Sequence, residues 1–447
     1  MSCRITRAIT LVAVTALALL GGVSGAQTRA PIVFWHAMDG QLGEAVSELA
    51  RQFNQSQSEF EVNAIYKGSY YEVQSAAIAA YRQKTPPSIV QVAEVGTLSM
   101  MLSDAIVPVQ RLMRQQRIEP RWSDFIETIS DYYEKDDRLL SMPFNASTPI
   151  FFFNKDIFKK VGLGDTPPAT WQEVETASRK ILASGAARCG FTASWPSWTM
   201  LENTFAWHDQ PFASNQNGYS AAIDTRLLIN SDFGLMHVGA LARWQKENIF
   251  SYGGRLDAPD SRFINGDCAM LVQSSASIGS FKKSVQFAWG TGQLPHWGQP
   301  YPKANSTLGG ATLWVMRGQE PGDYRGVAQF LKFVAEPAQQ GWWAATTGYL
   351  PITKAAVKNL EDDAFYKKNP EQWTGMSQLL NAKPTTASRG LRLGNYTQVR
   401  EAIEMELENI FAGKKTVKEG LDAAVLRGNA ILRQFGVTHV AAGQGEI

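Results

Sequence analysis

Short apolar stretches alternate with helical stretches along this chain, and the pattern limits it to a small number of folds. Residues 30–35, 60–66 and 88–95 are typical of buried strands, and a helical stretch lies between each neighbouring pair. Strands that begin about 28 residues apart with helices between them are typical of the βαβ units of a parallel sheet. Functional residues of such sheets collect at the carboxyl ends of the strands. This directs attention to His36, Tyr70 and Glu94.

The same alternation starts again after residues 142–171, the stretch MPFNASTPIFFFNKDIFKKVGLGDTPPATW. A polar turn there leads into the apolar run 150–153 and a charged amphipathic segment, so we interpret the stretch as the crossing from one α/β lobe to a second. The glycines at 309–310 indicate close approach of the backbone to a ligand or another segment. Further strands are predicted at 190–193, 268–273, 285–289 and 308–316, and long helices at 398–411 and 416–435. The chain therefore predicts a two-lobed α/β protein with a cleft that closes by hinge motion.

The N-terminus has the form of a secretory signal. Two arginines precede an apolar run at residues 9–20, and Ser24 and Ala26 offer the small residues of a cleavage site. The run is too short to span a membrane. Cleavage after residue 26 removes both arginines and leaves 41 basic and 41 acidic residues, from 43 and 41 in the whole chain. A neutral protein without a basic cluster argues against nucleic acid or an anionic membrane as the main partner.

Two of the three cysteines remain after such a cleavage. Cys3 leaves with the signal, and Cys189 and Cys268 stay. In an oxidising compartment the two could form a disulfide. Their positions in the sequence fix neither the connectivity nor the distance between them, so the paired and unpaired states both stay open. No cysteine follows the apolar run where a lipid anchor would need one, so we expect a protein that is not lipid-anchored.

Motifs for catalysis, metals and cofactors are missing from the sequence. The five histidines are scattered without metal-ligand spacing. No G-x-S-x-G elbow follows the signal, G-x-G-x-x-G does not occur, and residues 413–416 fail the phosphate-loop pattern. The sequence therefore predicts a ligand-binding cleft without a cofactor or a metal, and not an enzyme.

Short motifs along the whole chain resemble those of the family 1 extracellular solute-binding proteins of ABC importers. The motifs are FWH at 34–36, YKG at 66–68, EVG at 94–96, PFNASTP at 143–149, NKD at 154–156, NGDCAM at 265–270, TGYLPITK at 347–354 and GLRLGN at 390–395. The last two are the most specific. The resemblance implies a type II periplasmic binding protein fold. We predict a signal peptide at 1–26, lobe 1 at 27–146 and 307–350, lobe 2 at 147–306, and C-terminal helices at 351–447, mostly with lobe 2.

The resemblance also implies a function. It predicts a monomeric periplasmic protein that captures sn-glycerol-3-phosphate and delivers it to the permease subunits and cytoplasmic ATPase of an ABC importer. Arg400 would supply the permanent cation for phosphate oxygens. Glu94 would accept hydrogen bonds from glycerol hydroxyls, and Trp195 would cover the carbon chain. The implied ligand contacts are Tyr70, Glu94, Ser147, Trp195, Ser274, Gly310, Tyr349 and Arg400.

Three residues near the implied cleft depart from the family pattern and bear on ligand range. Asp39 stands where the family has Glu, Ala93 replaces an aromatic residue, and Tyr71 adds a ring beside Tyr70. Arg400 also has a structural alternative, pairing with Glu401 or Glu404. If Arg400 instead serves the ligand, we expect its replacement by alanine to leave the thermal transition nearly unchanged.

Other ligand classes stay open at this point. A glycerophosphodiester such as glycerophosphocholine is one, because an extra headgroup could be admitted at the Trp195 side. A sugar or oligosaccharide is another, and it would make Arg400 unnecessary. A periplasmic phosphodiesterase is the alternative from a different class, and it would need a metal cluster or an acid–base pair.

Overall fold

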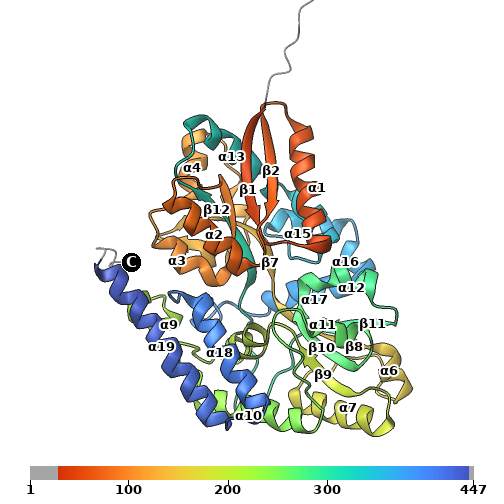
Figure 1. Cartoon of the computed structure of the whole chain (residues 1–447). Helices are drawn as coiled ribbons and strands as arrows, with labels where there is room; N and C mark the ends of the chain where they lie inside the picture. The colour runs from red at the N-terminus through yellow and green to blue at the C-terminus, as the bar shows by residue number, and fades with distance from the viewer. Residues whose placement is uncertain (1–28, 442–447) are drawn as a thin grey trace, which may run out of the picture.

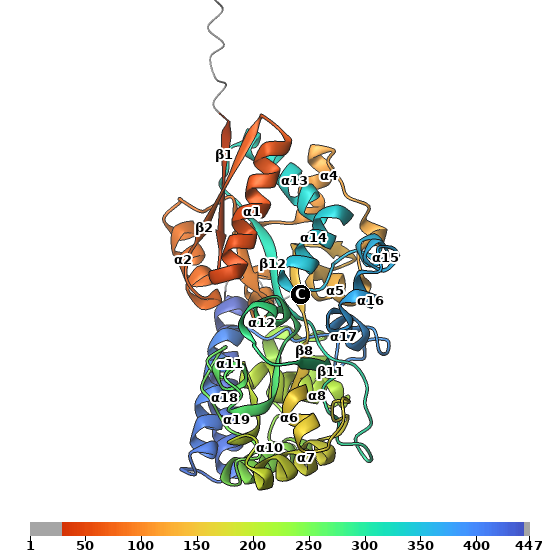
Figure 2. The same cartoon turned by 90° about the vertical axis from the view of Figure 1, so that its right-hand side faces the viewer.

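Two α/β lobes, one above the other in Figures 1 and 2, make up residues 29–441, which the computed structural model describes. One lobe contains a six-stranded sheet and the other a four-stranded sheet, so the predicted α/β class is confirmed. The predicted signal at 1–26 lies outside the described residues. Among the described helices, none is long and apolar enough to cross a membrane.

Lobe 1 begins with the predicted βαβ units. Its first strands, β1 (Ala30–His36), β2 (Phe60–Tyr66) and β3 (Ile89–Ala93), are parallel to one another. Helices α1 (Gly40–Ser56) and α2 (Tyr70–Arg82) connect them. The strands and helices predicted for this part of the chain are therefore confirmed.

The rest of the lobe 1 sheet depends on chain that returns from lobe 2. Strand β12 (Gly309–Met316) lies antiparallel between β3 and β4 (Ile106–Val107), and β7 (Met142–Ser147) pairs with its first residues. Helices α13 (Pro321–Ala335) and α14 (Pro337–Thr347) follow and share the buried core with β1 and β12. Lobe 1 is therefore discontinuous in sequence.

Lobe 2 is built on a sheet of four strands. Their order is β11 (Trp289–Gly292), β8 (Pro149–Asn154), β10 (Cys268–Ser274) and β9 (Cys189–Ala193). Helices α7 (Trp171–Ser184) and α10 (Asp232–Lys246) pack on one side, in a core that includes Phe151 and Phe153. Phe152 points to the opposite side, into a separate core. This confirms the prediction that the phenylalanine run belongs to the core of lobe 2.

The strand predicted at 285–289 is wrong. Val285 directly follows α12 (Ile278–Ser284) as its C-cap, and the strand that pairs with β8 runs from Trp289 to Gly292. A Cβ at Gly290 would lie 2.7 Å from the Phe153 ring, and one at Gly292 would lie 2.7 Å from the Pro167 ring. Glycine weakens the pattern by which a strand is recognised, so the prediction fell on the preceding residues.

The C-terminal part begins beside lobe 1 and ends along lobe 2. Helix α15 (Lys354–Asp362) contacts α14, whereas α18 (Tyr396–Phe411) and α19 (Val417–Ala441) lie side by side against α10 (Figure 1). Both long helices predicted here are confirmed. The remaining elements are short: α3 (Thr97–Met101), α4 (Val109–Gln116), α5 (Glu127–Ser130), β5 (Glu134–Lys135), β6 (Arg138–Leu139), α6 (Lys155–Lys160), α8 (Asn203–Trp207), α9 (Ser214–Asn217), α11 (Asp260–Ile264), α16 (Phe365–Lys368) and α17 (Pro370–Leu379).

Three segments that connect the lobes meet at one buried polar cluster. Thr148 lies between β7 and β8, where the chain passes from one sheet to the other. Its Oγ1 donates to Ser306 Oγ at 2.8 Å and accepts from Gln378 Nε2 at 3.0 Å. Gln378 Nε2 also donates to the Pro149 carbonyl at 2.6 Å. We call Thr148, Ser306 and Gln378 the crossing cluster.

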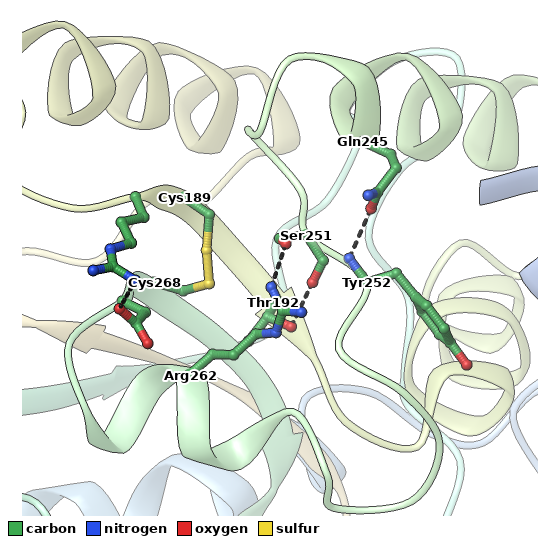
Figure 3. Close-up of a disulfide and its surroundings, with 9 residues drawn as sticks. Cys189, Thr192, Gln245, Ser251, Tyr252, Arg262 and Cys268 are labelled. Carbon is green, nitrogen blue, oxygen red and sulfur yellow. Dashed lines mark hydrogen bonds and ion pairs between the residues drawn. A yellow bond between two sulfur atoms is a disulfide. The ribbon is translucent and has the colours of Figure 1, made fainter. Parts of the chain in front are cut away.

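Cys189 and Cys268 form a disulfide between β9 and β10 (Figure 3). They face each other in the parallel register of the two strands, and both are buried. Farther along β9, Thr192 Oγ1 donates to the Ser251 carbonyl at 2.7 Å. The sequence left the state of the two cysteines open, and the structure pairs them across a sequence separation of 79.

Candidate functional site

One cavity of about 250 Å³ is lined by residues of both lobes. Its size suits a small ligand, because it lies just below the usual range for drug-sized molecules. All eight residues predicted as ligand contacts line it: Tyr70, Glu94, Ser147, Trp195, Ser274, Gly310, Tyr349 and Arg400. The three departures from the family pattern, Asp39, Ala93 and Tyr71, line it as well. The structure thus gathers the predicted set, while its contacts with a ligand stay a prediction.

The ends of strands and helices explain why these residues meet. Glu94 directly follows β3, Ser147 ends β7 and Ser274 ends β10. Gly310 lies at the beginning of β12, which runs antiparallel to β3 and therefore starts at the same edge of the sheet. Tyr70 is the first residue of α2, whose N-terminus is fixed by a capping box between Ser69 and Glu72.

Two neighbouring glycines of β12 leave no room for side chains. A Cβ at Gly309 would overlap the Trp198 indole, and one at Gly310 would overlap the Asn145 carbonyl oxygen. Gly310 also has φ of +106°, a conformation that L side chains rarely adopt. The close backbone approach that the sequence predicted at this strand entry is therefore confirmed.

A chain of amides positions the tyrosines of lobe 1. Gln91 Nε2 donates to Asn145 Oδ1 at 2.8 Å, and Asn145 Nδ2 donates to the Tyr70 hydroxyl at 3.0 Å. Burial, together with neighbouring Tyr349, raises the pKa of Tyr70 well above its usual value. Burial also raises the pKa of Tyr349. Both phenols are therefore neutral hydrogen-bonding groups at physiological pH.

Arg400 is held by two carboxylates and not by one. Its Nε and Nη2 donate to the two oxygens of Glu202 at 2.8 and 2.6 Å, and Nη2 also donates to Glu94 Oε1 at 2.8 Å. Burial opposes its charge, but attraction from Glu202 and then Glu94 raises the pKa of Arg400 well above its usual value. No acceptor among the described residues bonds Nη1. The structural alternative posed from sequence, pairing with Glu401 or Glu404, is wrong in its choice of partners.

Glu202 was missed by sequence reasoning. It ends a π-helical turn (Trp198–Glu202), is 3% exposed, and accepts a further hydrogen bond from Ser197 Oγ at 3.0 Å. Such turns are frequent at functional sites. The available signal was a single acid within the otherwise apolar and neutral run WTMLENTFAW, because a buried acid in such surroundings needs a cationic partner.

Glu94 lies between the cavity and the arginine. Burial raises its pKa, and Arg400 only partly offsets that effect. One carboxylate oxygen bonds Arg400 across the lobes, since Glu94 follows β3 of lobe 1 and Arg400 belongs to α18. The predicted hydroxyl-accepting role of Glu94 therefore depends on the other oxygen.

The two serines have different surroundings. Ser274 Oγ accepts from the Ala276 amide at 3.2 Å and so caps a short 3₁₀ turn while it lines the cavity. Ser147 is 2% exposed, and its hydroxyl has no hydrogen-bond partner among residues 29–441. Ser147 is therefore the hydroxyl with the greater freedom to bond a ligand.

An acidic wall of lobe 2 was also missed. Asp257 and Asp260 line the cavity, as Trp195 does. Asp260 Oδ1 accepts from Ser194 Oγ at 2.5 Å and from Gln273 Nε2 at 2.6 Å, and burial raises the pKa of Asp260 to about 7. No motif marks these residues, because they come from a loop and the start of α11 that only the fold brings to the cavity.

Residues 48–374 match the model of a family described as bacterial extracellular solute-binding protein. The chain is 44% identical over 423 residues to the sn-glycerol-3-phosphate-binding periplasmic protein UgpB of Shigella flexneri serotype 5b. The matched region covers 94% of this chain and 95% of that relative. It is 43% identical over the same shares to the protein of that name from Escherichia coli K12.

Solved structures show the same fold at lower identity. The UgpB of Mycobacterium tuberculosis in complex with glycerophosphocholine superposes with a TM-score of 0.77 at 22% identity, covering 91% of this chain and 99% of that one. The cyclic alpha-maltosyl-1,6-maltose binding protein of Arthrobacter globiformis gives 0.72 at 20%, covering 91% and 100%. These neighbours confirm the predicted two-lobed fold.

Proposed function

This chain belongs to the bacterial extracellular solute-binding protein family, and we propose that it captures sn-glycerol-3-phosphate between its lobes for import by an ABC transporter. The observation that carries the proposal is the cavity itself, because all eight residues implied by the sequence motifs line it together. Relatives at 43–44% identity that bind this compound by name support the same ligand.

The lining residues have the chemistry that a glycerol phosphate needs. Neutral hydroxyls of Ser147, Tyr70 and Tyr349 donate to phosphate oxygens without adding buried charge. Arg400 contributes through Nη1, because its other nitrogens already bond carboxylates. Glu94 accepts from a glycerol hydroxyl, and the Trp195 ring covers the carbon chain.

The proposal includes export and delivery without chemical change. Residues 1–26 direct the chain to the periplasm, where it acts as a monomer without a lipid anchor, and membrane permease subunits with a cytoplasmic ATPase receive the ligand. Its role is binding and not catalysis. Among the described residues, no group of three or more His, Cys, Asp or Glu side chains is placed to hold a metal ion.

A glycerophosphodiester such as glycerophosphocholine is the second candidate ligand. Asp39, Asp257 and Asp260 line the cavity, and the only arginine there is already paired with two carboxylates. An acid-rich wall repels the dianion of a phosphate monoester more than a diester, which carries one negative charge. A solved neighbour holds glycerophosphocholine.

Calorimetric titration of the purified, oxidised protein tests the proposal. The ligands are sn-glycerol-3-phosphate, glycerophosphocholine, maltose and inorganic phosphate, and each mixture is then examined for reaction products. We expect saturable binding of a phosphate ester that is recovered unchanged. Binding of maltose without any phosphate ester would contradict the ligand class, and formation of products would contradict a transport role.

A further inference from the structure

The anion-binding part of the cavity carries more negative than positive charge. Arg400 is the only lysine or arginine among the described residues that line the cavity. Two buried carboxylates bond its guanidinium, Glu94 at 2.8 Å and Glu202 at 2.6 Å. When all three side chains are ionised, the set has one net negative charge. A phosphate dianion placed at Arg400 would therefore add its charge to a site that is already negative.

Glu202 holds the guanidinium in place without lining the cavity itself. Its two carboxylate oxygens accept from Arg400 Nε at 2.8 Å and from Arg400 Nη2 at 2.6 Å. Ser197 Oγ donates to the same carboxylate at 3.0 Å. A two-point contact of this kind fixes the plane of a guanidinium. Glu202 therefore determines where Nη1, the nitrogen left for a ligand oxygen, is directed.

The other groups around Glu94 supply no further positive charge. Helix α18 contributes Arg400 and another buried acid, Glu404. The elements β3, α3 and β12 also contact the turn that Glu94 begins, and none of them carries a titratable side chain. Burial raises the pKa of five phenols close to Glu94: Tyr70, Tyr71, Tyr132, Tyr133 and Tyr349. These phenols are neutral around pH 7.

Glycerol-3-phosphate brings a group that can take up a proton near neutral pH. The second pKa of a phosphate monoester is about 6, so the free ligand is mostly a dianion at pH 7. In the cavity the phosphate would share Arg400 with Glu94, and two like-charged groups on one cation titrate as a coupled pair. Each negative charge raises the pKa of the other group. Burial, which raises the pKa of Glu94, acts in the same direction.

We infer that Glu202 is a positioning residue of the phosphate site: it directs Arg400 and offsets its charge, so that the protein takes up one proton for each glycerol-3-phosphate that it binds. The inference rests on the proposed function, since it concerns the same ligand and the same arginine. Glu202 thereby selects the singly charged state of a phosphate monoester, although it acts only through Arg400.

Calorimetry of the oxidised wild-type protein counts the protons directly. Titrations with sn-glycerol-3-phosphate at about pH 7.5, in buffers of different ionisation enthalpy, give the number of protons taken up per ligand, which should be about one. The affinity should then fall about tenfold from pH 7 to pH 8. A proton count near zero would overturn the inference without the use of any variant.

Glu202→Gln and Glu202→Asp separate charge from position. Glu202→Gln retains an oxygen for Arg400 but removes one negative charge, so the proton count should fall close to zero and the affinity should change less than about twofold from pH 7 to pH 8. Glu202→Asp restores the charge on a shorter side chain. It should keep the wild-type proton count but lose about tenfold in affinity, because Arg400 loses its two-point contact. Circular dichroism checks that both variants are folded.

Other buried acids provide the controls. Glu406 on α18 pairs with two cations outside the cavity, so Glu406→Gln removes the same charge and should keep the wild-type proton count. Burial raises the pKa of Asp260 and of Glu404 to about 7, which makes them the competing proton acceptors. Asp260→Asn and Glu404→Gln should keep the proton uptake. Its loss in either variant, together with its retention in Glu202→Gln, would overturn the inference.

The outcomes distinguish this inference from the proposed function. Binding of sn-glycerol-3-phosphate without proton uptake would overturn the inference and leave the proposed function standing. Absence of binding by any phosphate ester would overturn both. A lower affinity of Glu202→Gln with an unchanged proton count would show that Glu202 has a structural role alone, which also overturns the inference.

Discussion

Arg400 shows how one side chain can have a structural and a ligand-binding role together. Its side chain is 5% exposed and forms a two-point ion pair with Glu202, whose side chain is 2% exposed. Removal of one member of such a buried set leaves the others charged and unpaired in a medium of low polarity. The sequence alone predicted a ligand role without consequence for stability, and the ion pairs lead us to expect otherwise.

Arg400→Ala should lower the free energy of unfolding by about 3–5 kcal/mol, because Glu202 and Glu94 lose their shared cation. Urea denaturation followed by circular dichroism measures the change. The control is Arg400→Met combined with Glu94→Gln and Glu202→Gln, which removes all three charges and should recover most of the loss. An unchanged midpoint for Arg400→Ala would contradict the stabilising role of the ion pairs.

Asp260 makes stability depend on pH in an unusual direction for a carboxyl group. Burial raises its pKa to about 7 in the folded protein, against roughly 3.9 when unfolded. The folded form therefore binds more protons than the unfolded form between about pH 4 and 7, and the stability contributed by this group is lost as the pH rises through that window.

Asp260→Asn removes this dependence while its side-chain oxygen can still accept from Ser194 and Gln273. Relative to wild type, the variant should gain roughly 1–3 kcal/mol of unfolding free energy at pH 8 compared with pH 5. Urea denaturation of both proteins at the two pH values, without ligand, measures the difference. The contributions of titratable groups that both proteins share cancel in this comparison. A difference that does not vary with pH would disprove the raised pKa.

Secondary structure elements differ in how far the sequence predicts them. Strands rich in aliphatic and aromatic residues, such as β1 and β10, were found because their apolar pattern depends only on neighbours in the chain. Strand β11 was misplaced because its glycines serve contacts with Phe153 and Pro167. The same limit applies to the site: family motifs identified eight lining residues, but Glu202 meets Arg400 across a sequence separation of 198.

The disulfide joins the beginnings of β9 and β10. Cys189→Ala/Cys268→Ala should lower the free energy of unfolding by roughly 2–4 kcal/mol, because the unfolded chain is then no longer constrained by a bond across a sequence separation of 79. Ligand affinity should change little, because the cavity lies at the opposite, carboxyl ends of these strands. Urea denaturation with and without reductant measures the effect. Reductant should lower the urea midpoint of the wild-type protein alone. An equal lowering of the midpoint of the double variant would contradict the Cys189–Cys268 disulfide.

In the molecule as a whole, the crossing cluster joins segments that pass between the two lobes. Gln378 bonds Thr148 and the Pro149 carbonyl through Nε2, and its Oε1 accepts from the Leu294 amide at 2.7 Å. One side chain thus joins the connection between β7 and β8 to the segment that follows β11. Such a buried network favours one relative position of the segments that it joins.

Gln378→Leu should lower the free energy of unfolding by about 1–3 kcal/mol, because the Leu294 amide loses its acceptor. It should also change the radius of gyration of the ligand-free protein in X-ray scattering. Gln340→Leu is the matched control, since this buried glutamine likewise bonds the Val334 carbonyl and the Ile352 amide but does so inside lobe 1. Equal scattering curves for the two variants would refute a role of Gln378 in lobe position.

Strand β12 links the timing of synthesis to the completion of the fold. Chains emerge N-terminus first, so β1, β2 and β3 exist long before residues 309–316 arrive to lie between β3 and β4. Until then one edge of β3 has no partner and the helices α13 and α14 are missing from the core. A nascent chain of the first 300 residues therefore cannot close its N-terminal lobe. For the export proposed above, this means that the N-terminal lobe stays incomplete until the last third of the chain has been made.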